Sequence, residues 1–195
     1  METLAAFGRT LGFSFAAGIN LYATVAMLGL ALRYDWVALP PQYEAFAHPW
    51  IIGAALALYA IEFVADKVPW VDTAWDAVHT AVRPLGGAFI AVTTLGEASP
   101  AAEALVALLG GTVAAGTHLT KAGTRVAANA SPEPLSNWIL SLSEDLLVVG
   151  LGLLALRYPV AALVVVLALL AVIAVSLAAI LRLARRRWTR RPAAA

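Results

Sequence analysis

The sequence contains no cysteine, and only 13% of its 195 residues are charged. The absence of cysteine excludes disulfides, thiolate metal sites and cysteine nucleophiles. A soluble globule needs more charged side chains than this to cover its surface. Hydrophobic residues instead make up 62% of the chain, and its mean hydropathy is +0.83. The composition therefore predicts an integral membrane protein.

Sequence motifs for catalysis and metal binding are also missing. The chain has no GxGxxG, P-loop or GxSxG motif. Its three histidines, His48, His79 and His118, show neither His-x-x-x-His nor Glu-x-x-His spacing. These absences predict a protein that is not an enzyme, holds no metal ion and needs no cofactor.

Basic residues crowd the C-terminus, although the net charge is only +1. Membrane proteins concentrate arginine and lysine on the cytoplasmic side, so we expect a cytoplasmic tail over residues 182–195. Such a tail contacts anionic lipids more readily than nucleic acid. The N-terminus lacks a basic region before its first apolar stretch, which argues against a cleaved signal peptide. The tail contains Arg182, Arg185, Arg186, Arg187, Arg190 and Arg191.

Apolar runs upstream of this tail predict an all-α domain, residues 1–181, with six membrane-spanning helices. This count places both termini and the segment 67–83 in the cytoplasm. Residues 35–48 carry charges and a Pro-Pro pair, and are expected to form an outer interfacial loop. The predicted spans are 17–32, 49–65, 84–95, 101–120, 135–156 and 160–181.

A short motif occurs twice, as LGFSFAAGINL at 11–21 and as LGGTVAAGTHL at 109–119. Each copy puts a glycine near a polar residue inside an apolar run: Gly18 with Asn20, and Gly116 with His118. Three spans per half would orient the halves 1–98 and 99–181 oppositely. The pattern therefore predicts two inverted three-helix repeats with helices broken near both glycines. The alternative is that these glycines let neighbouring helices approach closely.

Broken helices would leave backbone groups free to bind a ligand and would add the partial positive charge of a helix N-terminus. The second copy also has a basic, hydroxyl-rich end. Together these features favour a small anionic or zwitterionic solute or a lipid headgroup. The predicted substrate-binding residues are Gly18, Asn20, Tyr22, Gly116, Thr117, His118, Lys121 and Arg125.

Two adjacent acids, Glu144 and Asp145, lie about nine residues beyond the start of their span, or about 13 Å, near the bilayer midplane. A charge there costs roughly 2.5 to 3.5 kcal/mol, which makes both acids functional candidates. Adjacent helical residues diverge by about 100°, so the two side chains are expected to have different partners. The alternative is a polar clasp to Lys121, Arg125, Asn20 or His118.

Two further groups of polar residues follow helical spacing. Glu62 and Asp66 stand at i and i+4 and join Glu144 and Asp145 as predicted coupling groups. A second set shares one face of an amphipathic helix, which would either lie on the headgroups or line a cytoplasmic entrance. The Pro-Leu-Gly-Gly sequence at 84–87 predicts a kink or partial re-entry. The entrance residues are Asp72, Asp76, His79 and Arg83.

Three sequence blocks, GINLYAT, EFVADKVPWVDTAWDAVHTAVRPLGG and PLSNWILSLSEDLL, resemble a family of bacterial membrane proteins known as domain-of-unknown-function family 4126. The resemblance runs from about residue 10 to about residue 180. It implies a compact multi-pass protein of the bacterial inner membrane, and it supplies no activity. It points to residues already singled out: Asn20, Glu62, Asp66, Asp72, Asp76, His79, Arg83, Glu144 and Asp145.

These observations favour a small secondary transporter or lipid-headgroup flippase, with a polar site at the midplane coupled to protons or a cation. The competing interpretation is a membrane scaffold or assembly factor, in which the same residues hold helices together. An ion channel is a third class, and it would need an oligomer to build its filter. Membrane lipids are the expected partners, nucleic acid is not, and a homo-oligomer is compatible with the sequence.

Overall fold

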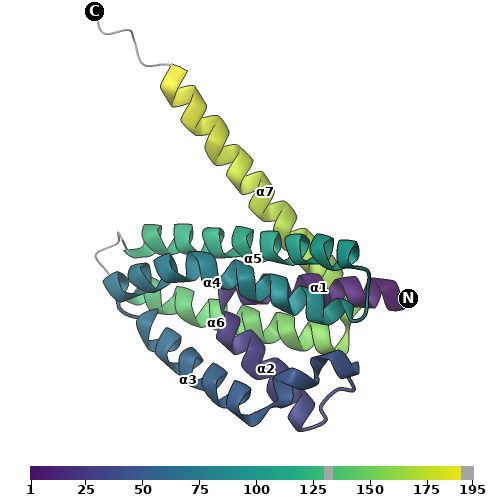
Figure 1. The fold of residues 1–195 in the computed structure, drawn as a ribbon. Helices are drawn as coiled ribbons and strands as arrows, with labels where there is room; N and C mark the ends of the chain where they lie inside the picture. Colours follow the sequence, from purple (N-terminus) through teal and green to yellow (C-terminus); the bar gives the residue numbers. More distant parts are fainter. Residues whose placement is uncertain (130–133, 190–195) are drawn as a thin grey trace, which may run out of the picture.

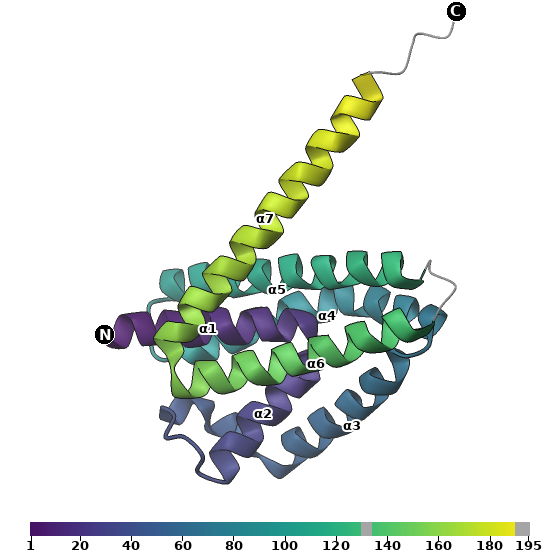
Figure 2. The ribbon, with the colours of Figure 1, turned by 180° about the vertical axis from the view of Figure 1, so that it is seen from behind.

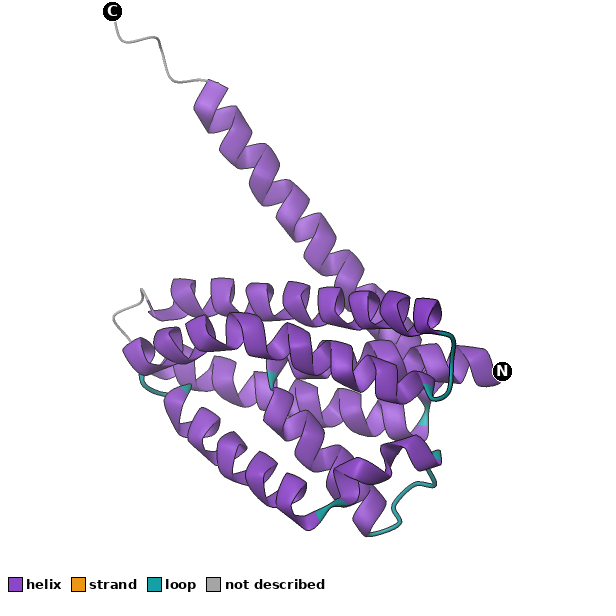
Figure 3. Cartoon of the chain, viewed as in Figure 1, coloured by secondary structure: helices purple, strands orange, loops and turns teal. Residues whose placement is uncertain are grey.

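The computed structural model describes residues 1–129 and 134–189, and all regular structure in these ranges is helical (Figures 1 and 3). The predicted fold class, all-α, is confirmed. Proline is the first residue of six of the helices, where its missing N–H would have no helical partner anyway. The helices are α1 (Glu2–Ile19), α2 (Leu21–Arg33), η1 (Pro41–Ala47), α3 (Pro49–Ala65), α4 (Pro69–Leu95), α5 (Pro100–Asn129), α6 (Pro134–Arg157) and α7 (Pro159–Thr189).

Three of these helices are long and apolar enough to cross a membrane: α5, α6 from Leu135, and α7 as far as Arg182. A fourth crossing is counted if η1 and α3, which meet at 61°, are taken as one span. The chain therefore has the helices of a multi-pass membrane protein. Helix α7 continues through most of the predicted tail to Thr189, and residues 190–195 lie outside the described residues.

Helices α1 and α2 form a hairpin that turns inside the bundle (Figures 1 and 2). The turn is Asn20, whose extended backbone (φ −147°, ψ 100°) cannot continue a helix. Its side-chain oxygen accepts a hydrogen bond from the Ala23 amide at 2.9 Å and so caps α2. The predicted break near Gly18 is thus found two residues later, but the predicted single span over 17–32 is wrong.

Both outer ends of the hairpin lie at the turn between α6 and α7. Gly8 of α1 abuts the backbone of Pro159, and Arg157 donates to the Trp36 carbonyl just beyond α2. After α2 in the chain, residues 41–47 form η1, and its Tyr43 and Phe46 side chains are buried. We call this the hairpin end of the bundle. The opposite end, where residues 66–72 meet Asn129, is the network end.

The two motif copies pack against each other and run in the same direction. Ser14 lies beside Gly110, Gly18 beside Ala114, and the Ile19 carbonyl accepts from Lys121, so positions rise together along α1 and α5. Figures 1 and 2 show the same parallel course. An inverted repeat requires antiparallel copies, so that prediction is wrong. Short matches of alanine, glycine and leucine arise from helix packing in membranes without any repeat.

Helices α4 and α5 are continuous where the sequence predicts interruptions. α5 runs unbroken through Gly116, and a Cβ there would meet nothing within 4 Å. One glycine costs a helix only about 1 kcal/mol relative to alanine, which thirty residues of helix can absorb. α4 likewise runs through Pro84. The predicted break at Gly116 and the predicted re-entry after Pro84 are therefore wrong.

The apolar core surrounds α1, with Phe13, Leu28 and Ile90 fully buried. Helix α7 packs on α1 near its start and then projects away from the bundle (Figures 1 and 2). Its later apolar residues, such as Leu177 and Ile180, are exposed. A helix that is apolar on all sides and exposed fits a lipid surrounding.

Candidate functional site

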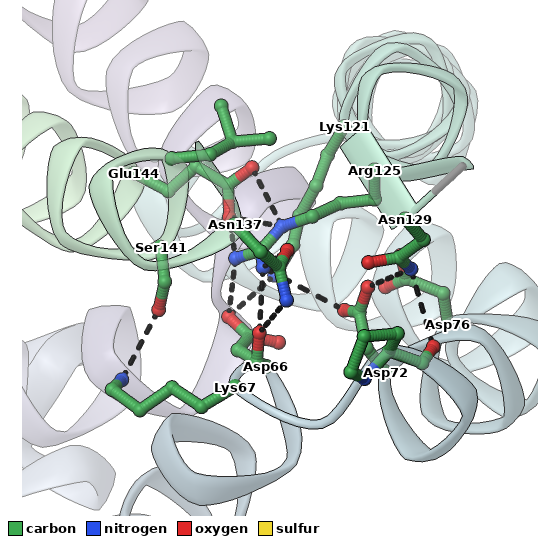
Figure 4. A network of polar contacts seen from close by, with 12 residues as sticks. Asp66, Lys67, Asp72, Asp76, Lys121, Arg125, Asn129, Asn137, Ser141 and Glu144 are labelled. Atoms are coloured by element: carbon green, nitrogen blue, oxygen red, sulfur yellow. Dashed lines mark hydrogen bonds and ion pairs between the residues drawn. The ribbon is translucent and has the colours of Figure 1, made fainter. Parts of the chain in front are cut away.

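Polar side chains from four helices meet in a buried cluster that begins at the end of α1, and Figure 4 shows part of it. We call it the charge network. Each member is no more than 9% exposed. Its members are Glu62 and Asp66 at the end of α3, Asp72, Asp76, His79 and Arg83 on α4, His118, Lys121 and Arg125 on α5, and Asn137 and Glu144 on α6.

Arg125 connects three helices at the centre of the network. Its Nη1 donates to the Asp66 carbonyl at 2.8 Å and to Asn137 Oδ1 at 3.0 Å, while Nη2 donates to Asp66 Oδ2 at 2.9 Å. Nε and Nη2 both donate to the Glu144 carboxylate. A planar guanidinium with five donors suits such a junction, and a lysine would not.

Lys121 and Arg83 both contact the end of α1. Lys121 Nζ donates to the Ile19 carbonyl (3.2 Å), and Arg83 Nη1 lies 3.5 Å from the Gly18 carbonyl. Glu62 Oε1 accepts from both cations, at 2.8 Å from Arg83 and 3.4 Å from Lys121. These carbonyls carry the partial negative charge of a helix C-terminus. The break therefore presents the C-terminus of α1 to these cations, whereas the N-terminus of α2, which the sequence predicted as an anion site, is capped by the Asn20 side chain.

His118 is held as a neutral acceptor. Arg83 Nη1 lies 2.7 Å from His118 Nδ1, and because a guanidinium has no lone pair, the imidazole must accept. Its other nitrogen then carries the proton and faces Thr80 Oγ1 at 3.2 Å. His79 donates from Nδ1 to the Trp75 carbonyl at 2.7 Å, and its Nε2 is 3.0 Å from the Tyr22 hydroxyl.

The network holds more negative than positive groups. Five buried carboxylates (Glu62, Asp66, Asp72, Asp76 and Glu144) face three cations (Arg83, Lys121 and Arg125). The first four of these acids each have one buried oxygen without a hydrogen bond. The free oxygen of Asp76 is 3.2 Å from Arg83, and that of Asp72 is 4.0 Å from Arg125. An uncompensated buried carboxylate is costly, so protons or cations are expected to relieve the excess.

The predicted acids of α6 face different neighbours, as their angular spacing predicts. Glu144 contacts Arg125 and lies 3.6 Å from Lys121. Asp145 makes neither contact; it lies within electrostatic reach of Tyr59 and Lys67, and also of Asp66 and Lys121. The entrance residues on α4 also point inward and are buried, so that segment does not lie on the headgroups.

Several predicted substrate residues have structural partners. Gly18 allows close contact with Ala114 and Thr117, as the packing alternative predicts. The Asn20 side chain caps α2. Gly116 is a helical residue with open space beside it.

Sequence reasoning missed Asn137, which shares the α6 face of Glu144 because it lies two turns earlier. It also missed Lys67, whose Nζ stands 3.1 Å from the Phe63 ring centroid and donates to Ser141 at 3.2 Å. Burial lowers the pKa of Lys67, while Asp145 and Asp66 act in the opposite direction. Within residues 1–129 and 134–189, no group of three or more histidine or acidic side chains is placed to hold a metal ion.

Two cavities flank the Arg125–Glu144 pair. A cavity of about 310 Å³ lies beside the last turns of α1, between α1, α5, α6 and α7, and Lys121 and Glu144 line it. A smaller one of about 190 Å³ lies between α4 and α5 and is lined by Asp76, Thr80 and Arg125. An apolar groove of about 430 Å³ between α6 and α7 shares Ser143 and Leu147 with the first cavity.

The family model described as "Domain of unknown function (DUF4126)" matches residues 8–179. The chain belongs to this family, as the three sequence blocks predict. No curated protein and no solved structure matches the chain.

Proposed function

We propose that this member of the DUF4126 family is a small transporter or lipid-headgroup flippase, coupled to protons or a cation through the charge network. One observation carries the proposal: a surplus of buried carboxylates lies between two cavities. The protein would act in the inner membrane of a bacterium, among membrane lipids and without a catalytic role.

The excess of buried acids over cations distinguishes a coupling site from a polar clasp that only holds helices together. A clasp is most stable when each buried charge has a partner, since an unpaired one keeps its desolvation penalty. Here the five buried acids outnumber the three cations by two. Glu62 Oε2 and Asp66 Oδ1 accept no hydrogen bond. Taking up and releasing a proton or cation within the network would change the contacts between the surrounding helices. Intramembrane acids in transporters act in this way.

The cavities supply two approaches to that site. Arg125 lines the cavity between α4 and α5, and its partner Glu144 lines the cavity beside the last turns of α1. Opening of this one ion pair would connect the two. A change in the charge of the network is therefore expected to change access between them.

We further propose that α3 to α7 each cross the bilayer, whereas α1 and α2 enter and leave at the hairpin end. Six spans with two cytoplasmic termini would require α1 and α2 together to form one crossing. Gly8 and Trp36, near the outer ends of these two helices, instead both contact the turn between α6 and α7, so the two ends lie on the same side. Lys67 and the arginine-rich stretch make the network end the cytoplasmic one.

Proteoliposomes on a solid-supported membrane test the coupling. A jump in proton, sodium or potassium concentration should give a transient current with the wild type and none with Glu62→Gln. Glu44→Gln, an exposed acid outside the network, is the matched control and should behave as the wild type. A folded wild-type protein that gives no current with any of the three cations would contradict the proposal.

A scaffold is the second candidate function. It is favoured by Arg125, which joins α3, α5 and α6 through direct hydrogen bonds. A scaffold predicts that Glu62→Gln changes stability without any loss of current, because no current exists in the wild type.

A further inference from the structure

Most of the polar side chains that line the cavity beside the last turns of α1 are hydroxyl groups whose protons are already in use. Thr117, Thr120 and Thr124 each donate to a carbonyl of α5, and Ser143 donates to Leu140 of α6. A hydroxyl has one proton and two lone pairs. These four side chains therefore present only acceptors to a ligand.

The cations near the cavity have no donor to offer either. Lys121 has three protons, and its Nζ contacts the Ile19 carbonyl, Glu62, Asp66 and Glu144. Glu144 is the most exposed acid of the network, with 11% of its side chain accessible against 7% or less for the other four. The polar part of the cavity thus combines hydroxyl lone pairs with a carboxylate.

We infer that this cavity binds the ammonium group of an amphiphilic amine, whose apolar chain lies in the groove between α6 and α7. An ammonium carries three donors and a positive charge, which match the acceptors and Glu144. The shared residues Ser143 and Leu147 make the groove continuous with the cavity, and the groove is otherwise lined by Leu146, Gly150, Leu151, Leu154 and Val165.

The same chemistry disfavours a phosphate-bearing lipid. A phosphate needs donors beside the ammonium site, and the side chains that line this cavity, all of which the structure describes, leave none free. The anion favoured by the basic sequence around Lys121 therefore has no donor here. The inference rests on the proposed transport function in treating this cavity as the substrate site, and it names the substrate class.

Binding of octylammonium to the whole protein in phosphatidylcholine nanodiscs tests the inference. Calorimetry should show saturable binding of octylammonium and none of octanoate, which has the same chain and no donor. Leu147→Trp fills the junction of cavity and groove and should weaken binding at least tenfold. Leu142→Trp, on the exposed face of α6 outside both, should bind as the wild type. Thr120→Val removes one acceptor and should weaken binding about fivefold.

Octanoate binding as tight as octylammonium binding, or unchanged binding to a folded Leu147→Trp, would overturn the inference. Displacement of octylammonium by nanodiscs rich in phosphatidylethanolamine would overturn the choice of a phosphate-free amine. Saturable octylammonium binding without cation-coupled transport in proteoliposomes would contradict the transport function and support the amine site. Cation-coupled currents without octylammonium binding would support the transport function and contradict the amine site.

Discussion

The two halves of the bundle are held together by different means. At the hairpin end, α1 fills the centre, and small residues let helices approach closely, as Gly8 does against the Pro159 backbone and Gly12 against the Ala155 methyl group. Towards the network end, α1 is missing and long charged side chains from α3 to α6 occupy the space that it leaves. The comparison teaches that ending one helix halfway converts a close-packed core into a polar site.

The two ends should also face opposite sides of the membrane, and this is the largest expected effect. The chain has no cysteine, so single cysteines can be introduced without background. A cysteine replacing the exposed Thr3 should react with an impermeant reagent from one face, and one replacing the exposed Thr73 only from the other. Labelling of both from the same face would break the comparison.

Removal of Arg125 should be the most damaging single substitution in the network half. Arg125→Met leaves Glu144 and Asp66 without their main partner, which costs roughly 3 to 5 kcal/mol in comparable buried pairs. Size-exclusion chromatography and thermal unfolding in detergent measure the loss. Arg125→Lys should recover only part of it, because a single ammonium cannot reach three helices.

The double variant Arg125→Met, Glu144→Gln sharpens this prediction. Neutralising Glu144 together with its partner should restore part of the lost stability, because one of the uncompensated charges is then gone. A double variant no more stable than Arg125→Met would contradict the pairing.

Glycine substitutions test the hairpin half. Gly18→Ala places a methyl against the backbone of Ala114, and overpacking of this kind typically costs about 1 to 3 kcal/mol. Gly116→Ala, the same change in the second motif copy, meets open space and should stabilise α5 by up to about 1 kcal/mol. Thermal unfolding compares them. Equal destabilisation by both substitutions would indicate that the two glycines have equivalent surroundings, as a structural repeat predicts.

The smallest effect on stability is expected from Glu62→Gln. The amide oxygen can still accept from Arg83 and Lys121, and four buried acids still face the three cations without Glu62. We expect a change below about 1 kcal/mol in unfolding free energy, within the range of tolerated substitutions. A loss of stability as large as that of Arg125→Met would contradict an excess of acids over cations in the network.

The sequence predicted the membrane class, the family and the charged residues of the network, because intramembrane charges are rare enough to stand out. The spacing of Asp72, Asp76, His79 and Arg83 predicted one shared face, and that face is buried. Direction could not be predicted, because hydropathy measures the length of an apolar run and not whether the chain turns back within it. Asn20 signals the turn only because asparagine is among the residues preferred at a helix N-cap, and histidine, which stands at the matching position 118, is not among them.

The partners of each charge were also beyond prediction. Arg125 meets Asp66 across 59 positions, and such pairs depend on how helices are placed rather than on periodicity. The open choice between packing and broken helices at the two glycines was decided by contacts alone. Gly18 touches α5, and Gly116 touches no neighbouring helix.

Infrared spectroscopy of the protein at neutral pH tests the surplus of carboxylates most directly. We expect the carbonyl stretching band of protonated carboxyl groups in sodium- and potassium-free buffer, because the five buried acids outnumber the three cations and a buried charge without a partner is costly. The band should weaken when acids of the network are replaced by their amides and stay unchanged in the control Glu44→Gln. A spectrum without that band, from a protein that also holds no tightly bound cation, would contradict the existence of a proton- or cation-binding site in the network.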